Sequence, residues 1–312
     1  MSIDRETIEA MAQVIGPKIR RTPVIDIAME GIDRPVTLKL EHLQHTGSFK
    51  ARGAFANLLG CEVPKAGIAA ASGGNHGAAA AYAAQMLGLP ARIFVPAIAS
   101  PAKVRKIAGY GATIVQDGVN YYAALENCLA YVRASGALNV HAYDEEPTLI
   151  GQGTVGKEIS EQVPDLDTLL VAVGGGGLIG GIAAWYDGRV RVVGVEPETC
   201  NALHASLQAG KPVTVTPSGL AADSLGASFA GSLMFPIAQK YIPEVALVRD
   251  ADIVEAQRYL WDTLRLVTEP GGAAAFAALL SGAYRPQRDE RVGVVLCGAN
   301  TDPETFGKSI AT

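Results

Sequence analysis

One lysine of the sequence stands where an amine could do chemistry. Lys50 follows the turn "TGS" (46–48) and Phe49, and good helix formers come after it, so it falls in the first turn of a predicted helix. The helix dipole disfavours a cation at that end. A lysine held there loses its proton more readily and can act as a nucleophile or a base. The stretch therefore predicts a reactive amine at Lys50.

Four glycine-bearing or polar loops share a position in the predicted fold. Each falls at the end of a predicted strand or at the start of a predicted helix. In an open parallel sheet, ligands bind at the edge where the carboxyl ends of the strands lie. A tight turn is the alternative for any one loop, but four of them favour a binding site. The loops are "TGSFK" (46–50), "SGGNHG" (72–77), "GGGGLIGG" (174–181) and "CGAN" (297–300).

The tetraglycine loop is suited to a phosphate. It follows a predicted strand and opens a predicted helix, so its N–H groups and the helix dipole can attract an anion. Gly175, Gly177 and Gly180 also fit the GxGxxG pattern, and Glu196 ends the next strand, where a ribose-binding acid would stand. An NAD-dependent dehydrogenase is therefore one hypothesis. It leaves "TGSFK" and "SGGNH" unexplained, and the first half of the chain has no obvious hydride-transfer site.

A ligand with one phosphate and one aldehyde accounts for more of the loops. Lys50 supplies the amine for a Schiff base. The tetraglycine loop supplies the phosphate site, and the Asn75 amide can donate a hydrogen bond to a phenolic oxygen. This interpretation uses three of the four loops.

The elements that must position these loops alternate between strands and helices, which is typical of α/β domains with parallel crossovers. The longest apolar run, 169–185, has glycines in its middle, so we expect a buried strand, a loop and a helix there and no membrane span. Predicted strands cover 67–72, 91–96, 112–117, 168–173, 189–197 and 291–300, the last running into a loop; predicted helices cover 76–88, 102–108, 120–136, 178–188 and 252–267.

Composition excludes several classes of protein. The chain has 312 residues, of which 49% are hydrophobic and 18% charged, so it can bury a large core. A net charge of −5 argues against nucleic acid as a partner. The N-terminus has no apolar signal core. Cys61, Cys128, Cys200 and Cys297 lack CxxC spacing, which indicates reduced thiols in a cytoplasmic protein and neither a zinc site nor a disulfide framework.

Six stretches between about 21 and 300 carry a resemblance to a known family. The chain resembles the fold-type II pyridoxal-phosphate enzymes, in particular the serine/threonine dehydratase and serine racemase group. The resemblance implies an α/β fold of two open, twisted, mostly parallel sheets flanked by helices. It also implies a large cofactor-binding domain (1–60 and 146–312), a small substrate-closing domain (61–145) and a homodimer. The stretches are "LEHLQHTGSFKARGA", "ASGGNHGAAAAYAA", "VGGGGLIGG", "GVEPE", "TEPGGAA" and "VVLCGAN".

The same resemblance assigns roles to residues. Lys50 is expected to carry pyridoxal 5'-phosphate and to act as the catalytic base. For Glu269 and His76, a helix cap or a satisfied loop residue remains an equal alternative. The expected cofactor-binding residues are Lys50, Phe49, Asn75, Gly174, Gly175, Gly176, Gly177, Glu269 and Cys297, and the expected substrate-binding residues are Ser72, Gly73, Gly74, Asn75 and His76.

The implied reaction is the removal of water from a β-hydroxy L-amino acid, such as L-threonine or L-serine, to give a 2-oxo acid and ammonia. Action on 3-hydroxyaspartate or another β-hydroxy amino acid, or racemisation of serine, are the alternatives. Racemases of the group carry a serine where this chain has Gly73, so racemisation should be weak. Relatives that hold a divalent cation use an acid where this chain has Ala202, so we expect no metal site. Replacement of Lys39 is expected to be mild.

Overall fold

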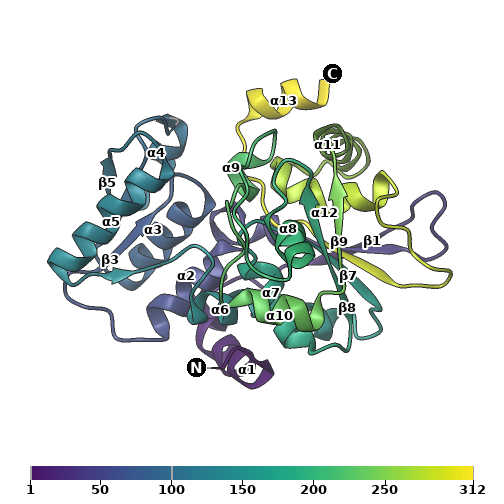
Figure 1. Ribbon diagram of the computed structural model, residues 1–312, viewed down its shortest axis with the longest axis horizontal. Coiled ribbons are helices and arrows are strands. Elements are labelled where there is room, and N and C mark those ends of the chain that lie inside the picture. The colour runs from purple at the N-terminus through teal and green to yellow at the C-terminus, as the bar shows by residue number, and fades with distance from the viewer. Residues whose placement is uncertain (1, 100, 312) are drawn as a thin grey trace.

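Two mostly parallel sheets organise the chain (Figure 1). The computed structural model describes residues 2–99 and 101–311. The six-stranded sheet has the order β1-β2-β10-β7-β8-β9, in which β1 and β2 pair antiparallel and the other neighbours pair parallel. The four-stranded sheet has the order β5-β4-β3-β6 and is parallel throughout. The predicted α/β fold with two mostly parallel sheets is therefore confirmed.

Each strand predicted from the sequence is present within a few residues of its predicted bounds. The strands are β1 (Val24–Ile27), β2 (Val36–Lys39), β3 (Ile68–Ala71), β4 (Ala91–Val95), β5 (Thr113–Gln116), β6 (Leu138–Asn139), β7 (Thr168–Ala172), β8 (Arg191–Pro197), β9 (Glu244–Val248) and β10 (Val292–Val295). Every residue of β2, β3, β7 and β10 is buried. Burial on both faces explains the apolar sequences of β3 and β10, whereas β2 also buries Thr37 and Lys39.

Helices surround both sheets (Figure 1). The α-helices are α1 (Arg5–Ile15), α2 (Lys50–Leu59), α3 (Asn75–Leu87), α4 (Pro101–Ala108), α5 (Tyr121–Ser135), α6 (Glu146–Gln162), α7 (Gly177–Tyr186), α8 (Ala202–Ala209), α9 (Ala222–Leu225), α10 (Met234–Tyr241), α11 (Asp250–Leu264), α12 (Pro270–Leu280) and α13 (Pro303–Ala311). Short 3₁₀ turns follow α1 and β2, namely η1 (Gly16–Lys18), η2 (Glu41–Leu43) and η3 (His45–Gly47).

The four-stranded sheet is covered on both faces. Ala70 of β3 belongs to a core cluster with the alanines of α3, whereas Ala69 and Ala71 belong to another cluster with Cys128 of α5. Because successive strand residues point to opposite faces, α3 and α5 pack on opposite sides of this sheet. The alanine-rich sequence of α3 lets that helix lie close to the strands.

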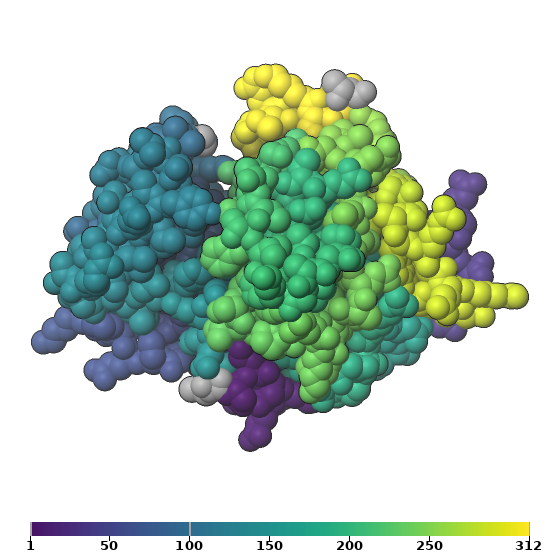
Figure 2. Space-filling model, viewed as in Figure 1, coloured from purple at the N-terminus to yellow at the C-terminus, as the bar shows by residue number. Residues whose placement is uncertain are grey.

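The two sheets draw on separate parts of the sequence. Strands of the four-stranded sheet lie between residues 68 and 139, and those of the six-stranded sheet lie outside that segment. In the space-filling view, a groove separates the blue-to-teal part of the chain from the green part (Figure 2). The division into domains 1–60 with 146–312 and 61–145 stays a prediction, taken up below.

The longest apolar run divides as its glycines indicate. Residues 168–172 form β7, and α7 begins at Gly177 after Gly176, whose φ of +88° requires glycine. Within the described residues, no helix is both long enough and apolar enough to cross a membrane.

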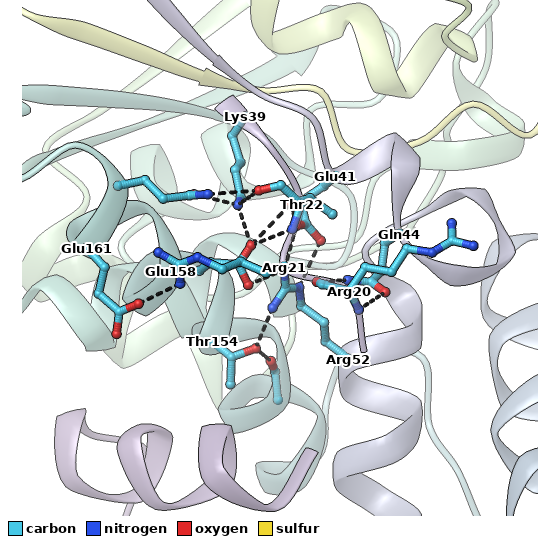
Figure 3. A network of polar contacts seen from close by, with 12 residues as sticks. Arg20, Arg21, Thr22, Lys39, Glu41, Gln44, Arg52, Thr154, Glu158 and Glu161 are labelled. Atoms are coloured by element: carbon cyan, nitrogen blue, oxygen red, sulfur yellow. Dashed lines mark hydrogen bonds and ion pairs between the residues drawn. The ribbon is translucent and has the colours of Figure 1, made fainter. Parts of the chain in front are cut away.

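A network of buried charges connects β2, η2, α2 and α6 (Figure 3). Arg52 donates to Glu41 at 2.6 and 2.9 Å and to Glu158 at 3.0 Å. Lys39 donates to Glu158 at 2.5 Å and to the Thr22 carbonyl at 2.8 Å. The exposed fractions of Lys39, Glu41 and Arg52 are 1%, 0% and 1%. The network therefore holds two cations and two carboxylates away from water.

The position of Lys39 overturns one expectation from the sequence. Replacement of Lys39, on the predicted strand before Lys50, was expected to be mild. The side chain is instead buried and ion-paired with Glu158. Removing one partner of a buried ion pair leaves the other charge uncompensated, which typically costs about 3–5 kcal/mol of unfolding free energy. Nothing local in "TLKLEH" signals that partner, because Glu158 is 119 positions away.

Candidate active site

A cavity of about 50 Å³ lies where the carboxyl ends of central strands of the six-stranded sheet meet the start of α3. Ala172 ends β7 and Cys297 follows β10, whereas Asn75 begins α3 and Gly177 begins α7. This is the edge at which open parallel sheets bind ligands. All residues predicted to bind the cofactor line the cavity, namely Phe49, Lys50, Asn75, Gly174, Gly175, Gly176, Gly177, Glu269 and Cys297.

Lys50 is the first residue of α2, as its sequence context predicted. Its Nζ donates a hydrogen bond to the Ala142 carbonyl at 2.8 Å and lies 5.0 Å from the centroid of the Phe49 ring. Burial lowers the pKa of the Lys50 amine to about 8. Hydration stabilises the ammonium form, so the loss of hydration on burial is the main cause of the readier deprotonation of Lys50.

Backbone hydrogen bonds hold the turn that precedes Lys50. The Gly47 N–H donates to the Gln44 carbonyl at 2.9 Å, and the Phe49 N–H donates to the Cys297 carbonyl at 3.2 Å. The turn thus attaches Lys50 to the end of β10, and the lowered pKa owes more to burial than to the helix terminus.

The tetraglycine loop approaches its neighbours too closely for side chains. A Cβ on Gly175 would lie 2.3 Å from Cγ of Tyr143, and a Cβ on Gly176 would lie 2.4 Å from Cε of Met234. The first N–H groups of α7 have no acceptor within the helix. Together with the helix dipole, they form an anion-binding end directed at the cavity. Tyr143 also lines the cavity, and no motif in the sequence pointed to it.

Two further ionisable groups, Cys297 and Glu269, line the cavity together with Lys50. Burial raises the pKa of the Cys297 thiol to about 12, so this group is neutral at physiological pH. Its Sγ lies 3.4 Å from the Gly271 carbonyl. Burial also raises the pKa of the Glu269 carboxyl to about 7. Glu269 precedes α12, but its side chain makes no capping hydrogen bond and accepts one from the Asn75 amide at 2.6 Å.

A second cavity, of about 430 Å³, adjoins the first. Asn75, Ser224 and Glu269 line both cavities. The second cavity also reaches Gly73 and Gly74 of the predicted substrate loop. Its wall includes residues that the sequence analysis did not single out, among them Ala78, Lys103, Lys106, Ile107 and Asp223.

The side chains of Ser72 and His76 point to other partners. Ser72 Oγ accepts a hydrogen bond from the N–H of Gly74 at 3.2 Å. His76 is buried, its Nε2 lies 2.8 Å from the Val140 carbonyl, and burial lowers its pKa to about 3. The imidazole is therefore neutral and donates to Val140. This contact supports the alternative in which His76 is a satisfied loop residue. The hydrogen bond attaches α3 to Val140, in the segment that follows β6.

Glu196, the residue behind the dinucleotide hypothesis, is engaged elsewhere. Its carboxylate is fully buried and accepts hydrogen bonds from the N–H groups of Leu203 at 2.9 Å and His204 at 2.8 Å. It therefore caps the start of α8. Among residues 2–99 and 101–311, no cluster of three His, Cys, Asp or Glu side chains is arranged to hold a metal ion.

Comparison with known proteins gives the same family along the chain. Residues 15–298 match the family described as "Pyridoxal-phosphate dependent enzyme". The chain is 36% identical to the phenylserine dehydratase of Ralstonia pickettii, over 99% of this chain and 98% of that protein. It is 34% identical to an L-threonine ammonia-lyase of Thermotoga maritima, over 99% of this chain and 78% of that protein.

Solved structures agree with the sequence relatives. Maize serine racemase has a TM-score of 0.91 at 32% identity, covering 99% of this chain and 98% of that one. The processed form of threonine deaminase isoform 2 from Solanum lycopersicum has a TM-score of 0.90 at 26% identity, covering 99% of this chain and 94% of that one. The match extends over both sheets and over every loop that lines the cavity. The chain therefore belongs to the family of pyridoxal-phosphate dependent enzymes.

Proposed function

We propose that the protein is a dehydratase that removes water from a β-hydroxy L-amino acid and releases a 2-oxo acid and ammonia. The observation that carries the proposal is the single cavity lined by the Lys50 amine, the start of α7 and the neutral Cys297 thiol. The relatives named as phenylserine dehydratase and L-threonine ammonia-lyase support this reaction. L-Threonine and L-serine are the simplest substrates of this class.

The donors around the cavity fit pyridoxal phosphate. Lys50 would hold its aldehyde carbon through Nζ, and the N–H groups of 174–177 would hold its phosphate. Asn75 would donate to the phenolic oxygen through its amide, which already donates to Glu269. Cys297 would face the pyridine nitrogen. Each requirement of the cofactor, namely an amine, an anion site and a neutral ring partner, has a matching group.

The chain's own residues would set the course of the reaction. Bound pyridoxal phosphate delocalises the charge left on the substrate Cα when its proton departs. The Lys50 amine, once released to the substrate side, would take that proton, because its lowered pKa leaves a substantial neutral fraction near pH 8. A carboxylate in place of Cys297 would keep the pyridine nitrogen protonated, whereas a thiol of raised pKa does not. The weaker electron sink favours rapid loss of the β-hydroxyl.

The second cavity bears on the choice of substrate. Its apolar wall includes Ala78, Ile107 and Pro270, and it shares Asn75 and Glu269 with the first cavity. A methyl group would leave much of this space unfilled. The size and apolar lining favour a β-hydroxy amino acid with a large apolar substituent as a second candidate. The phenylserine dehydratase among the relatives supports it.

A test of the function begins with the colour of the purified protein. We expect visible absorbance that is lost on borohydride treatment, and release of 2-oxo acid from L-threonine, L-serine and L-phenylserine. A panel that adds 3-hydroxyaspartate ranks the substrates. A colourless protein that NAD protects against thermal unfolding would instead support the dehydrogenase hypothesis.

The substitution Gly73→Ser tests which face of the substrate lacks an acid. A Cβ on Gly73 would meet Ala99 Cβ at 3.4 Å, an ordinary van der Waals contact, so a serine fits. The unmodified enzyme should form almost no D-serine, because residue 73 has no proton to give. We expect measurable D-serine from Gly73→Ser, and lower dehydration because the added atoms crowd the carboxylate loop. Chiral chromatography of serine after incubation measures both.

Gly73→Ala is the matched control for this experiment. It adds the Cβ without the hydroxyl, so it should lower dehydration without forming D-serine. Abundant D-serine from the unmodified enzyme would contradict the placement of Gly73 and show that another group supplies the second proton.

The remaining expectations concern organisation. We propose that 61–145 is a small domain that closes on the domain formed by 1–60 and 146–312. An ion pair between Lys103 of α4 and Asp223 of α9 supports this, because it spans the second cavity between the two parts. The expected homodimer and cytoplasmic location follow from the resemblance and composition. Light scattering and cell fractionation test them.

A further inference from the structure

The buried charges around Arg52 form a complete set. Arg52 donates through Nε and Nη2 to Glu41, through Nη2 to Glu158 and through Nη1 to Thr154 at 3.2 Å. Glu41 accepts a further hydrogen bond from Thr22 at 2.5 Å, and Glu158 accepts from Lys39. Figure 3 shows these side chains converging from separate elements. With two cations and two carboxylates the set is neutral, so it has no unbalanced charge.

The network touches the helix that begins at Lys50. Arg52 is two residues after Lys50 in α2. At about 100° per residue, side chains two positions apart leave a helix on nearly opposite sides. Lys50 accordingly points into the cavity, and Arg52 points into the network. Contacts that hold Arg52 therefore set the rotation of α2 about its axis, and that rotation determines where the Lys50 amine lies.

The same segment is attached to the strand that leads to Cys297. The Leu296 N–H donates to the Lys39 carbonyl at 2.9 Å, and the Leu296 carbonyl accepts from the His42 N–H at 2.8 Å. The Cys297 carbonyl accepts from the Phe49 N–H at 3.2 Å. Side-chain ion pairs of the network thus hold the segment from Lys39 to Arg52. Backbone hydrogen bonds attach the same segment to Leu296 and Cys297.

We propose that Arg52 is a positioning residue for Lys50. By bridging Glu41 and Glu158, it fixes the first turn of α2 and holds the Lys50 amine at a set place relative to Cys297. The inference deepens the proposed function, on which it rests, since it concerns the same amine.

Arginine suits this role better than lysine. Its planar guanidinium binds two oxygens of Glu41 in parallel and still reaches Glu158 and Thr154. A lysine carries the same charge on a flexible stem and cannot reproduce the fork. Buried ion pairs add little net stability compared with apolar packing of the same volume. Positioning is therefore the more economical explanation for the burial of Arg52.

A pair of charge-conserving variants separates positioning from structural support. Arg52→Lys alters the cation on α2, and Lys39→Arg alters the other buried cation of the same network, on β2. Cofactor-free protein is mixed with pyridoxal phosphate, and the rate and extent of visible absorbance are followed. The kcat, the KM and the thermal unfolding of the cofactor-free protein are measured alongside.

We expect both variants to unfold at a lower temperature and to differ in the rate of cofactor attachment and in kcat. Arg52→Lys should attach the cofactor more slowly and lower kcat by about tenfold or more, because a displacement of 1 Å can cost about 100-fold. Its KM should change little, since the substrate loop lies on α3. Lys39→Arg should attach the cofactor at nearly the rate of the unmodified protein and keep its kcat.

Two results would overturn the proposal. One is normal attachment and kcat in Arg52→Lys, and the other is an equal loss in both variants, which indicates general structural support. If Arg52→Lys does not fold, Thr154→Val decides, because it removes one contact to Arg52 without changing charge. It should slow attachment in the same manner to a smaller extent, and normal attachment overturns the proposal. Failure of the proposed function itself differs from all of these, because the unmodified protein would then attach no cofactor.

Discussion

Replacement of Lys50 by alanine is expected to abolish turnover of every β-hydroxy amino acid tested. The variant loses the amine that would hold the cofactor and the base that would take the Cα proton. General base catalysis alone contributes about 10²–10⁴-fold to rate, and the loss of covalent attachment adds to that. Absorbance of dialysed protein and oxo-acid release measure the two losses separately.

A matched lysine substitution controls for the loss of a cation. Lys308→Ala removes a lysine whose side chain is 76% exposed on α13 and pairs with Glu304 on the surface. It should retain full absorbance and full activity. If Lys50→Ala keeps ordinary dehydratase activity, the assignment of this residue is wrong.

The substitution Gly176→Asp is expected to cause the second-largest effect, the loss of bound cofactor. It places a carboxylate beside the proposed phosphate site at the start of α7. Two unit charges 4 Å apart near a protein surface interact by about 4 kcal/mol, which corresponds to a loss of affinity of about 1,000-fold. Titration of the cofactor-free variant with pyridoxal phosphate, followed by visible absorbance, measures the loss.

Backbone strain and crowding must be separated from charge in this experiment. Gly176 has a φ of +88°, and any Cβ there would meet Met234. Gly176→Asn has nearly the same shape and carries no charge, so the two variants share the strain. The affinity of Gly176→Asp for pyridoxal phosphate should be well below that of Gly176→Asn. Equal affinity in the two variants would show that the loop does not hold the phosphate.

Much of the fold could be predicted from local patterns. The strand ending at Ala71, the helix from Asn75 and the strand 168–172 all follow from short apolar runs bounded by glycine. The loops at strand ends were visible as glycine-rich stretches, and parallel topology brings such ends to one edge. The cavity therefore contains every residue predicted to bind the cofactor, although their roles remain proposals.

The roles of individual polar side chains were harder to predict from the sequence. Glu269 could cap a helix or face the cofactor site, and its contact with Asn75, 194 positions away, shows that it does not cap α12. His76 donates to the Val140 carbonyl, which no motif records. Tyr143 packs against Gly175 and has no sequence signature at all.

The sequence by itself determined the family, part of the alternation of strands and helices, and the place of Lys50 at the start of a helix, because these depend on contiguous residues. The tertiary structure alone decided the burial of Lys39 and Arg52 in one network and the pKa of the Lys50 amine. Burial and ion pairing depend on partners such as Glu158, which lies 106 positions from Arg52. The charge states of side chains in the site are therefore set by the packing of segments that are distant in the sequence. The local sequence does not predict that packing.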